Sequence, residues 1–236
     1  MRGMLLECWR TVYGWACRAP TRPYAITVLT VSAAMFAIAF TWHTLHYIGA
    51  VGARLPALLS PFDDSSLLEA WELVLTLIAA AAVGWAGWRR RDGLLIAWML
   101  VLLVIAGDNR LRWHERAGHA LGPALEPFAV GPVEGRHLGE LAFWLVVGVC
   151  ALLAFAIGLR RRTANGVIAT VVLATLLAAL AVFAVVVDLV HVVTRSNLAG
   201  FAEDGGELLV VTLASVTAVA VALSPAVGGG HPATDR

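Results

Sequence analysis

The sequence predicts an all-α polytopic membrane protein, with six transmembrane helices in one bundle and both termini in the cytoplasm. Three observations predict this class. Hydrophobic residues make up 60% of the 236 residues and charged residues only 14%, whereas a soluble domain carries roughly 25% charged residues. Six apolar segments are each long enough to cross a hydrocarbon core of about 30 Å. Arginines gather on one side of these segments, which the positive-inside rule assigns to the cytoplasm.

The first 23 residues predict an amphipathic helix on the cytoplasmic surface of the membrane. Arg2, Arg10, Arg18 and Arg22 alternate with apolar and aromatic residues, a pattern typical of interfacial helices. A secretory signal peptide is the alternative. The apolar segment that follows is longer than the roughly 7–15 residues of a signal-peptide core, and no small-residue cleavage site ends it. We therefore favour the interfacial helix.

Six apolar segments are predicted to span the membrane. Their bounds are 24–48, 67–88, 93–111, 138–159, 166–193 and 206–224. Arginine triplets at 89–91 and 160–162 lie on the same side as the N-terminal segment, so that side is predicted to be cytoplasmic. The domains are therefore a surface segment at 1–23, a transmembrane bundle at 24–224 and a disordered cytoplasmic tail at 225–236.

The longest outer connection, 112–137, contains Pro123, Pro127 and Pro132 together with several glycines. Because proline interrupts a helix, this composition predicts an ordered loop or lid and no further helix.

Ionisable residues crowd the outer ends of the predicted spans. Only three of the 16 carboxylates and one of the seven histidines fall on the cytoplasmic side. Each span carries an acid or histidine pair at its outer end, at a spacing that places both members on one helix face. In chain order these are His43 and His46, Glu69 and Glu72, Asp108 and Glu115, His137 and Glu140, Asp188 and His191, and Glu203, Asp204 and Glu207.

The third pair belongs to a dense run of ionisable groups between Asp108 and His119. If the third helix continues through this run, Asp108, Arg112, Glu115 and His119 share one helix face. His114 lies off that face. The run is therefore predicted to form one wall of a polar site.

Asp108, Glu72 and Glu207 are predicted to lie below the outer boundary of the membrane. At a rise of ~1.5 Å per residue they stand about 22–25 Å from the inner ends of their spans, within a core of ~30 Å. A charged side chain at mid-depth costs on the order of 2.5–3.5 kcal/mol, although a shallow position reduces this cost. Residues of this kind usually face the bundle interior, are paired and serve function.

A divalent metal site is the first interpretation of these pairs. Carboxylate and imidazole groups from facing helices are typical ligands of zinc and of non-haem iron or manganese. The predicted ligands are Glu69, Glu72, Asp108, Glu115, His137, Glu140, Asp188, His191, Glu203, Glu207, His43 and His46. Such a site would suit a membrane-embedded metal-dependent hydrolase or a di-metal oxidase. Haem, with His46, His137 or His191 as axial ligand, is a minor variant.

Two other functions remain open. In the structural alternative, arginines on the same side neutralise the carboxylates in a buried network. These arginines are Arg110, Arg112, Arg116, Arg136 and Arg195. In the transport alternative, the acids mark the pathway of a proton or another cation. No predicted span contains proline, and serine and threonine are the polar residues of the deep halves, so no pathway across the inner half is indicated.

Three short motifs stand at span ends: Asp63-Asp64 ahead of Glu69-Ala70-Trp71, His114-Glu115, and Glu203-Asp204-Gly-Gly-Glu207. They resemble motifs of a large family of bacterial multi-pass membrane proteins that has no assigned activity. Two positions depart from the family pattern. Asn109 stands where the family has Glu in an Asp-Glu pair, and Asp204 stands where it has the second Glu of Glu-Glu-x-x-Glu.

The resemblance implies a six-helix protein of the bacterial inner membrane and supports the choice of site residues without naming a reaction. The expected partners are the lipid bilayer and a lipid or small-molecule substrate that arrives from the outer side. No nucleic-acid partner is expected, because the charges are sorted by side and form no basic patch. The oligomeric state is left open.

Overall fold

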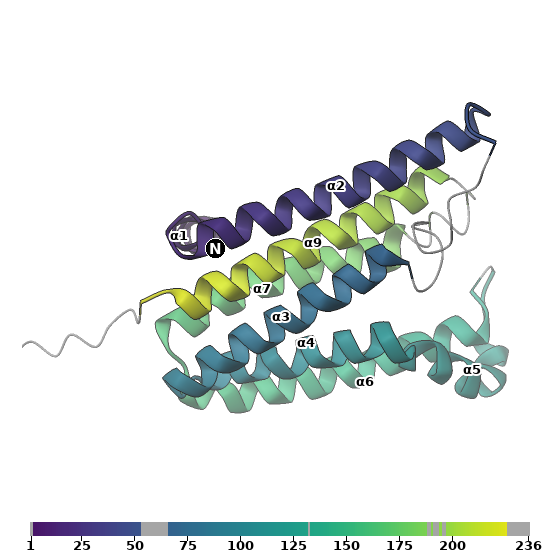
Figure 1. Ribbon diagram of the computed structural model, residues 1–236. Helices are drawn as coiled ribbons and strands as arrows, with labels where there is room; N and C mark the ends of the chain where they lie inside the picture. The colour runs from purple at the N-terminus through teal and green to yellow at the C-terminus, as the bar shows by residue number, and fades with distance from the viewer. Residues whose placement is uncertain are drawn as a thin grey trace, which may run out of the picture.

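The computed structural model describes residues 2–52, 66–131, 133–187, 190, 194 and 197–225. Within these residues the chain is helical and forms no strand, and six helices are long and apolar enough to cross a membrane (Figure 1). The predicted all-α membrane fold is therefore confirmed. The six helices are α2 (Thr21–Tyr47), α3 (Leu67–Arg90), α4 (Gly93–Leu111), α6 (Gly135–Gly158), α7 (Ala164–Ala181) and α9 (Asn197–Leu223).

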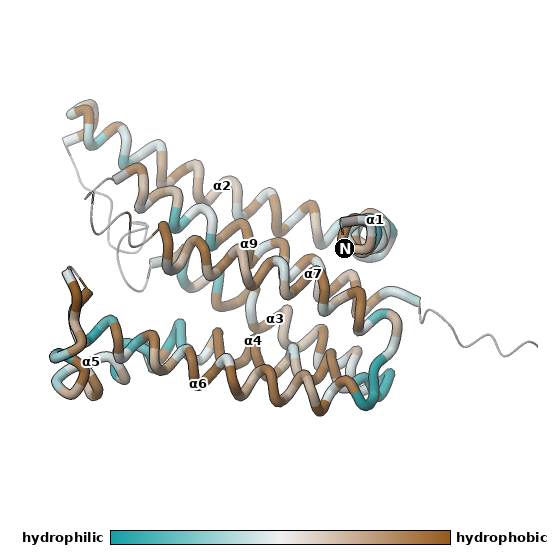
Figure 2. Tube along the Cα trace, turned by 180° about the vertical axis from the view of Figure 1, so that it is seen from behind, coloured by the Kyte–Doolittle hydropathy of each residue, from teal (hydrophilic) through white to brown (hydrophobic). Residues whose placement is uncertain are grey.

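The bundle has two polar ends with an apolar stretch between them (Figure 2). The arginine end holds Arg89–Arg91 and the short 3-10 helix η3 (Leu159–Arg161). At this end the guanidinium of Arg90 donates a hydrogen bond of 2.7 Å to the carbonyl oxygen of Ser224, just beyond α9. The acidic end is the opposite one, where α2 and α4 end and α3 and α9 begin. The positive-inside rule predicts that the acidic end is extracytoplasmic.

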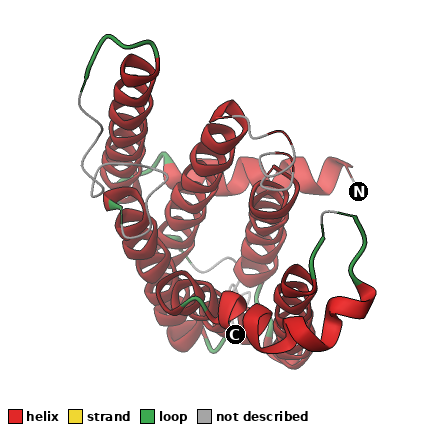
Figure 3. Cartoon of the chain, turned by 90° about the vertical axis from the view of Figure 1, so that its right-hand side faces the viewer, coloured by secondary structure: helices red, strands yellow, loops and turns green. Residues whose placement is uncertain are grey.

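Helix α1 (Arg2–Ala16) lies across the arginine end of the bundle, so that Figure 1 views it end on while α2 runs across the picture. Figure 3 shows its length from the side. Cys8, Val12 and Trp15 are buried in the same hydrophobic core as residues of α7 and α9, whereas Met4 and Tyr13 are exposed. The helix therefore has one face on the bundle and one face turned away from it.

Asp92 links the start of α4 to the start of α7 at the arginine end of the bundle. Its fully buried carboxylate accepts hydrogen bonds from the backbone N–H groups of Leu94 (2.9 Å) and Leu95 (3.2 Å), and so caps the first turn of α4. It also accepts hydrogen bonds from the N–H (2.9 Å) and the hydroxyl of Thr163, the residue that caps α7. One side chain thus fixes the starts of two transmembrane helices relative to each other.

The connection 112–137 contains a helix, α5 (Trp113–Leu125), so the prediction of a loop there was wrong. Pro123 lies inside α5, in its last turn, and therefore removes the backbone hydrogen bond that an N–H at this position would make to the carbonyl oxygen of His119. A 3-10 helix η2 (Glu126–Phe128) and an isolated bridge between Val130 and Val133 follow. Figure 1 shows that α5 folds back against the start of α6.

The third span ends at Leu111 as predicted, and the helix does not continue through the run from Asp108 to His119. Helix α4 ends at Leu111, and Arg112 adopts a left-handed conformation with φ of 51° before α5 begins. Asp108 and Glu115 therefore belong to two different helices and share no helix face. A left-handed residue other than glycine leaves no clear signal in the sequence, which is why the break was not predicted.

Two further bounds differ from the sequence analysis. Helix α9 begins at Asn197, about two and a half turns before the predicted start at 206, so Glu203 and Asp204 lie inside the helix. The fifth span is not one regular helix, because α7 continues into the π-helical turn η4 (Val182–Val187). Such turns are rare and are often found at functional sites.

Candidate functional site

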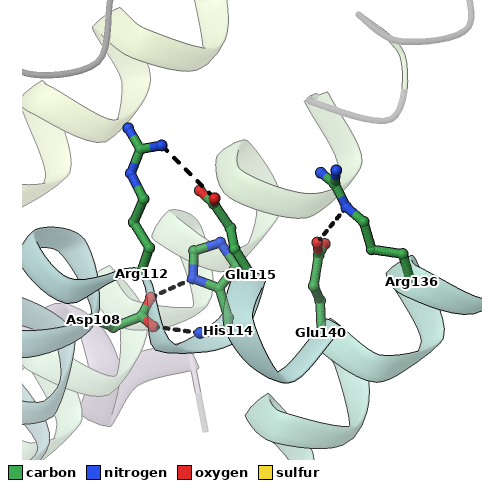
Figure 4. A network of polar contacts seen from close by, with 6 residues as sticks. All are labelled: Asp108, Arg112, His114, Glu115, Arg136 and Glu140. Atoms are coloured by element: carbon green, nitrogen blue, oxygen red, sulfur yellow. Dashed lines mark hydrogen bonds and ion pairs between the residues drawn. The ribbon is translucent and has the colours of Figure 1, made fainter. Parts of the chain in front are cut away.

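Ten of the twelve predicted ligands lie in the part of the chain that the structure describes; Asp188 and His191 lie outside it. The structure places most of these ten in two separate groups at the acidic end. The first is the α4–α6 polar network of Asp108, Arg112, His114, Glu115, Arg136 and Glu140 (Figure 4). The second is the α3–α9 acid cluster of Glu69, Glu72, Asp204 and Glu207.

Asp108 is the centre of the α4–α6 polar network, and both of its oxygens are engaged. The residue is 4% exposed. Its Oδ1 accepts the backbone N–H of His114 at 2.9 Å, and its Oδ2 lies 2.6 Å from Nδ1 of the His114 ring. The backbone bond satisfies one of the N–H groups that the start of α5 leaves without a helical partner. Asp108 therefore fixes the turn between α4 and α5.

The other two acids of this network pair with arginines. Glu115 lies 3.7 Å from Arg112, and Glu140 accepts a hydrogen bond of 3.0 Å from Nε of Arg136. Both pairs are partly exposed, and pairs of this kind contribute about 1 kcal/mol or less. Arg112 and Arg136, two of the five arginines named in the structural alternative, thus pair with carboxylates, in contacts that are partly exposed and not in a buried network.

Close glycine contacts bring α5 and α6 together. Gly118 and Gly122 on α5 face Gly139 and Gly135 on α6. A Cβ atom at Gly139 would stand 2.9 Å from Cα of Gly118 and 3.1 Å from the carbonyl oxygen of Ala117. Glycines four residues apart allow two helix backbones to approach in this way. The pairing of Gly118-x-x-x-Gly122 with Gly135-x-x-x-Gly139 was present in the sequence and was missed.

The histidines at this end differ in the ring nitrogen that they leave available. In His137, Nδ1 accepts the backbone N–H of Glu134 at 3.1 Å as part of a capping box, so the neutral ring carries its proton on Nε2. That ring offers no lone pair to a metal ion. In His46, Nδ1 lies 3.2 Å from the carbonyl oxygen of Val51 and donates to it, which leaves Nε2 with a lone pair.

His114 was the residue of this region with the least support in the sequence, yet it pairs with Asp108. The pKa of His114 is raised above its ordinary value of 6.5, chiefly because the hydrogen bond to Asp108 favours the imidazolium; partial burial opposes this, and Glu115 and Glu140 add to it. The stabilisation from the pair is fully present below the unfolded-state pKa of about 6.5. It is lost as the pH rises through the raised folded-state pKa.

We expect hydrogen exchange in α5 to quicken as the pH rises through the folded-state pKa of His114, beyond the intrinsic effect of pH on exchange. Mass spectrometry of peptides from α5 and α7 measures this, with α7 as the internal reference. Asp108→Asn should remove the additional dependence, because the amide does not favour the imidazolium. Equal pH dependence in the two helices of the wild-type protein would contradict the prediction.

The α3–α9 acid cluster brings acids from two spans together. Glu72 lies within electrostatic range of Glu207 and Asp204 on α9 and of Glu69 on its own helix. All four residues are partly exposed. Helices α3 and α9 pack along each other, which holds the two pairs of carboxylates at one level of the bundle.

The glycine pair between Asp204 and Glu207 has a packing role. A Cβ atom at Gly205 would stand 2.5 Å from the ring of Phe36 on α2, and one at Gly206 would collide with Phe183 of η4. Phe201 continues this aromatic contact, with its ring 5.0 Å from the ring of His43. The two glycines therefore let α2 and η4 close against one side of α9, while Asp204 and Glu207 lie near α3.

The residues that the structure describes contain no group of three or more His, Cys, Asp or Glu side chains placed to hold a metal ion. Eight of the ten described predicted ligands are instead divided between the acid cluster, the polar network and the helix-end contacts of His46 and His137. Of the other two, His43 contacts the ring of Phe201, and Glu203 lies within α9. Because Asp188 and His191 lie outside the described residues, the divalent metal stays a prediction.

Comparison of the chain with protein-family models, curated proteins and solved structures found no match.

Proposed function

We propose that this integral membrane protein binds a cation at the α3–α9 acid cluster, from the side that the positive-inside rule predicts to be extracytoplasmic. The observation that carries the proposal is the position of Glu72, which lies within electrostatic range of three other carboxylates on two packed membrane-spanning helices. Glu72 is 16 residues from Trp88, or about 24 Å along α3, which is inside a core of ~30 Å.

Electrostatics favours a cation at this place. A carboxylate at membrane depth costs on the order of 2.5–3.5 kcal/mol, and like charges that share a site add their mutual repulsion to that cost. A cation that binds between Glu72 and Glu207 lowers both terms.

The oxygen atoms of these carboxylates also indicate which type of cation would bind. The described cluster offers carboxylate oxygens, and oxygen ligands suit magnesium, calcium and manganese better than the softer metals. Zinc and iron, which the sequence also predicts, commonly have imidazole nitrogens among their ligands, and the four residues of the cluster supply none. An organic ammonium group needs only the charge and the acceptor oxygens of the carboxylates.

The test is cation binding to the protein in nanodiscs of zwitterionic lipid, measured by calorimetry with Mn²⁺, Ca²⁺, Zn²⁺ and methylammonium in turn. Glu72→Gln combined with Glu207→Gln should weaken binding of the cation that binds by at least about tenfold, since each exchange removes one charge. Glu140→Gln is the matched control, because it neutralises an acid at the same end that pairs with Arg136. Wild-type affinity in the double variant, or no binding of any of the four cations, would overturn the proposal.

A further inference from the structure

Two arginine triplets stand at the arginine end of the bundle. Residues 89–91 lead from α3 into α4, and residues 160–162 lead from α6 into α7. Figure 2 shows hydrophilic residues gathered at this end. The positive-inside rule explains why arginines lie on this side of the membrane, but it does not determine how two triplets are placed relative to each other.

The structure holds the two triplets against each other. A Cβ atom at Gly93 would stand 2.7 Å from Cα of Gly158, so the backbones of the two turns touch where α4 begins and α6 ends. The carboxylate of Asp92 accepts the N–H of Thr163 at 2.9 Å and also accepts its hydroxyl. Helix η3, which contains the start of the second triplet, contacts α4 as well. The six arginines are therefore brought to one place.

Five of the six arginines are exposed there. Arg90 is the exception, because it donates to the carbonyl oxygens of Ala222 and Ser224 at the end of α9. All residues of both turns are described, and the acid among them, Asp92, is fully buried. The two turns thus present positive charge and no exposed acid. We call the exposed five the arginine patch: Arg89, Arg91, Arg160, Arg161 and Arg162.

Apolar and aromatic side chains border the arginine patch on the membrane side. Trp88, directly before the first triplet, is 82% exposed, and the guanidinium of Arg89 lies 4.6 Å from the centre of the Trp85 ring. On α6, Ile157 and Leu153 are exposed about one and two turns before the second triplet. Only 6% of the most apolar stretch of α6 is buried. A ligand at the patch therefore meets charge at its head and a hydrocarbon-facing surface beside it.

We infer that the arginine patch binds the phosphate head group of an anionic phospholipid, with the acyl chains along the exposed face of α6. Guanidinium groups form bidentate pairs with phosphate oxygens and keep their charge at all physiological pH values. Basic surfaces between membrane helices on the cytoplasmic side are typical sites for such head groups. The apolar border selects a lipid over a phosphate ion. The site lies at the opposite end from the α3–α9 acid cluster and does not depend on the proposed function.

The experiment measures binding of cardiolipin, phosphatidylglycerol and phosphatidylcholine to the whole chain in detergent micelles, by native mass spectrometry. Both anionic lipids should bind more than about tenfold more tightly than phosphatidylcholine, because each arginine near an anionic head group contributes about fivefold in affinity. Arg89→Gln with Arg91→Gln, and separately Arg160→Gln with Arg162→Gln, should each weaken cardiolipin binding at least about fivefold.

Arg18→Gln with Arg22→Gln is the matched control. This pair removes two exposed charges at the same end, but near the start of α2, which lies across α9 from α4 and α6 (Figure 1). Because salt screens exposed charges beyond about 8–10 Å, cardiolipin binding should stay within about twofold of the wild-type value.

Gly158→Val keeps every arginine and should separate the two turns, because an added Cβ atom would stand 2.6 Å from the carbonyl oxygen of Gly93. It should also weaken cardiolipin binding at least about fivefold. Gly158→Ala is a milder second variant in case the first fails to fold. Wild-type cardiolipin binding by a folded variant at this position would overturn the inference, since the two triplets would then not act as one site.

Three further results would overturn the inference. One is an equal loss of cardiolipin binding in the control pair and in the patch pairs, which indicates attraction to the charged surface as a whole. Another is phosphatidylcholine binding as tightly as the anionic lipids. The third is displacement of cardiolipin by inorganic phosphate at equal phosphate concentration, which indicates a site for a phosphate ion. None of these results bears on the cation site, which Glu72→Gln with Glu207→Gln tests separately.

Discussion

Asp92→Ala is expected to lower the free energy of unfolding by about 3 kcal/mol or more. The Asp92 carboxylate is fully buried and accepts hydrogen bonds from Leu94, Leu95 and both the N–H and the hydroxyl of Thr163. Alanine would leave these buried donors without their acceptor, and each such loss costs roughly 1–3 kcal/mol before relaxation. Equilibrium unfolding in mixed micelles, followed by far-UV circular dichroism, measures the change.

Glu7→Ala is a suitable control for Asp92→Ala, because Glu7 is an exposed acid of α1 at the same end of the bundle. Its effect should stay within about 0.5 kcal/mol, as is usual for surface exchanges. If the two variants unfold at the same denaturant concentration, Asp92 does not hold α4 and α7 together in the way described.

Gly139→Val is expected to detach α5 from α6. A Cβ atom at this position would meet Cα of Gly118 and the carbonyl oxygen of Ala117, which are backbone atoms and cannot turn aside as a flexible side chain can. Overpacking of this kind costs about 1–3 kcal/mol. The ion pairs of the α4–α6 polar network lie within the α4–α5 turn or within α6, so they should persist while the contact between α5 and α6 is lost. Limited proteolysis within residues 113–125 and hydrogen exchange of the same segment measure the detachment.

Gly148→Val is the matched control for this exchange. Gly148 lies on the same helix and has no atom within 4 Å of the position of an added Cβ. It should leave α5 as protected as in the wild-type protein. Equal proteolysis of the two variants would show that the added side chain acts on α6 itself and not on its contact with α5.

Much of the fold could be predicted from composition and length, because a membrane-spanning helix needs only a sufficient run of apolar residues. The bounds of the third span, 93–111, were predicted correctly. The errors lie where the chain leaves the apolar core. The sixth span was predicted to begin at 206, whereas Gly205 and Gly206 lie inside α9 and contact Phe36 and Phe183.

The candidate site was harder to predict than the spans, since helix-face spacing places a residue on its own helix and not against a neighbour. The spacing of Glu69 and Glu72 was visible in the sequence, but the proximity of Glu72 to Asp204 and Glu207 follows from how α3 packs on α9. The partner of Asp108 could not be predicted because it depends on the left-handed Arg112. Of the five arginines that the sequence offered as possible partners for carboxylates, Arg112 and Arg136 form such pairs.

The position of α9 has a consequence for the biosynthesis of the protein. Helix α9 is the most buried of the six spans, because 61% of the residues in its most apolar 18-residue stretch are buried inside the bundle. It contacts α1, α2, α3 and α7. It is also the span that follows the other five in the chain. Membrane segments are made and inserted from the N-terminal side onward. The first five spans therefore enter the membrane before α9 is present to pack against them, and the α3–α9 acid cluster forms only when α9 inserts.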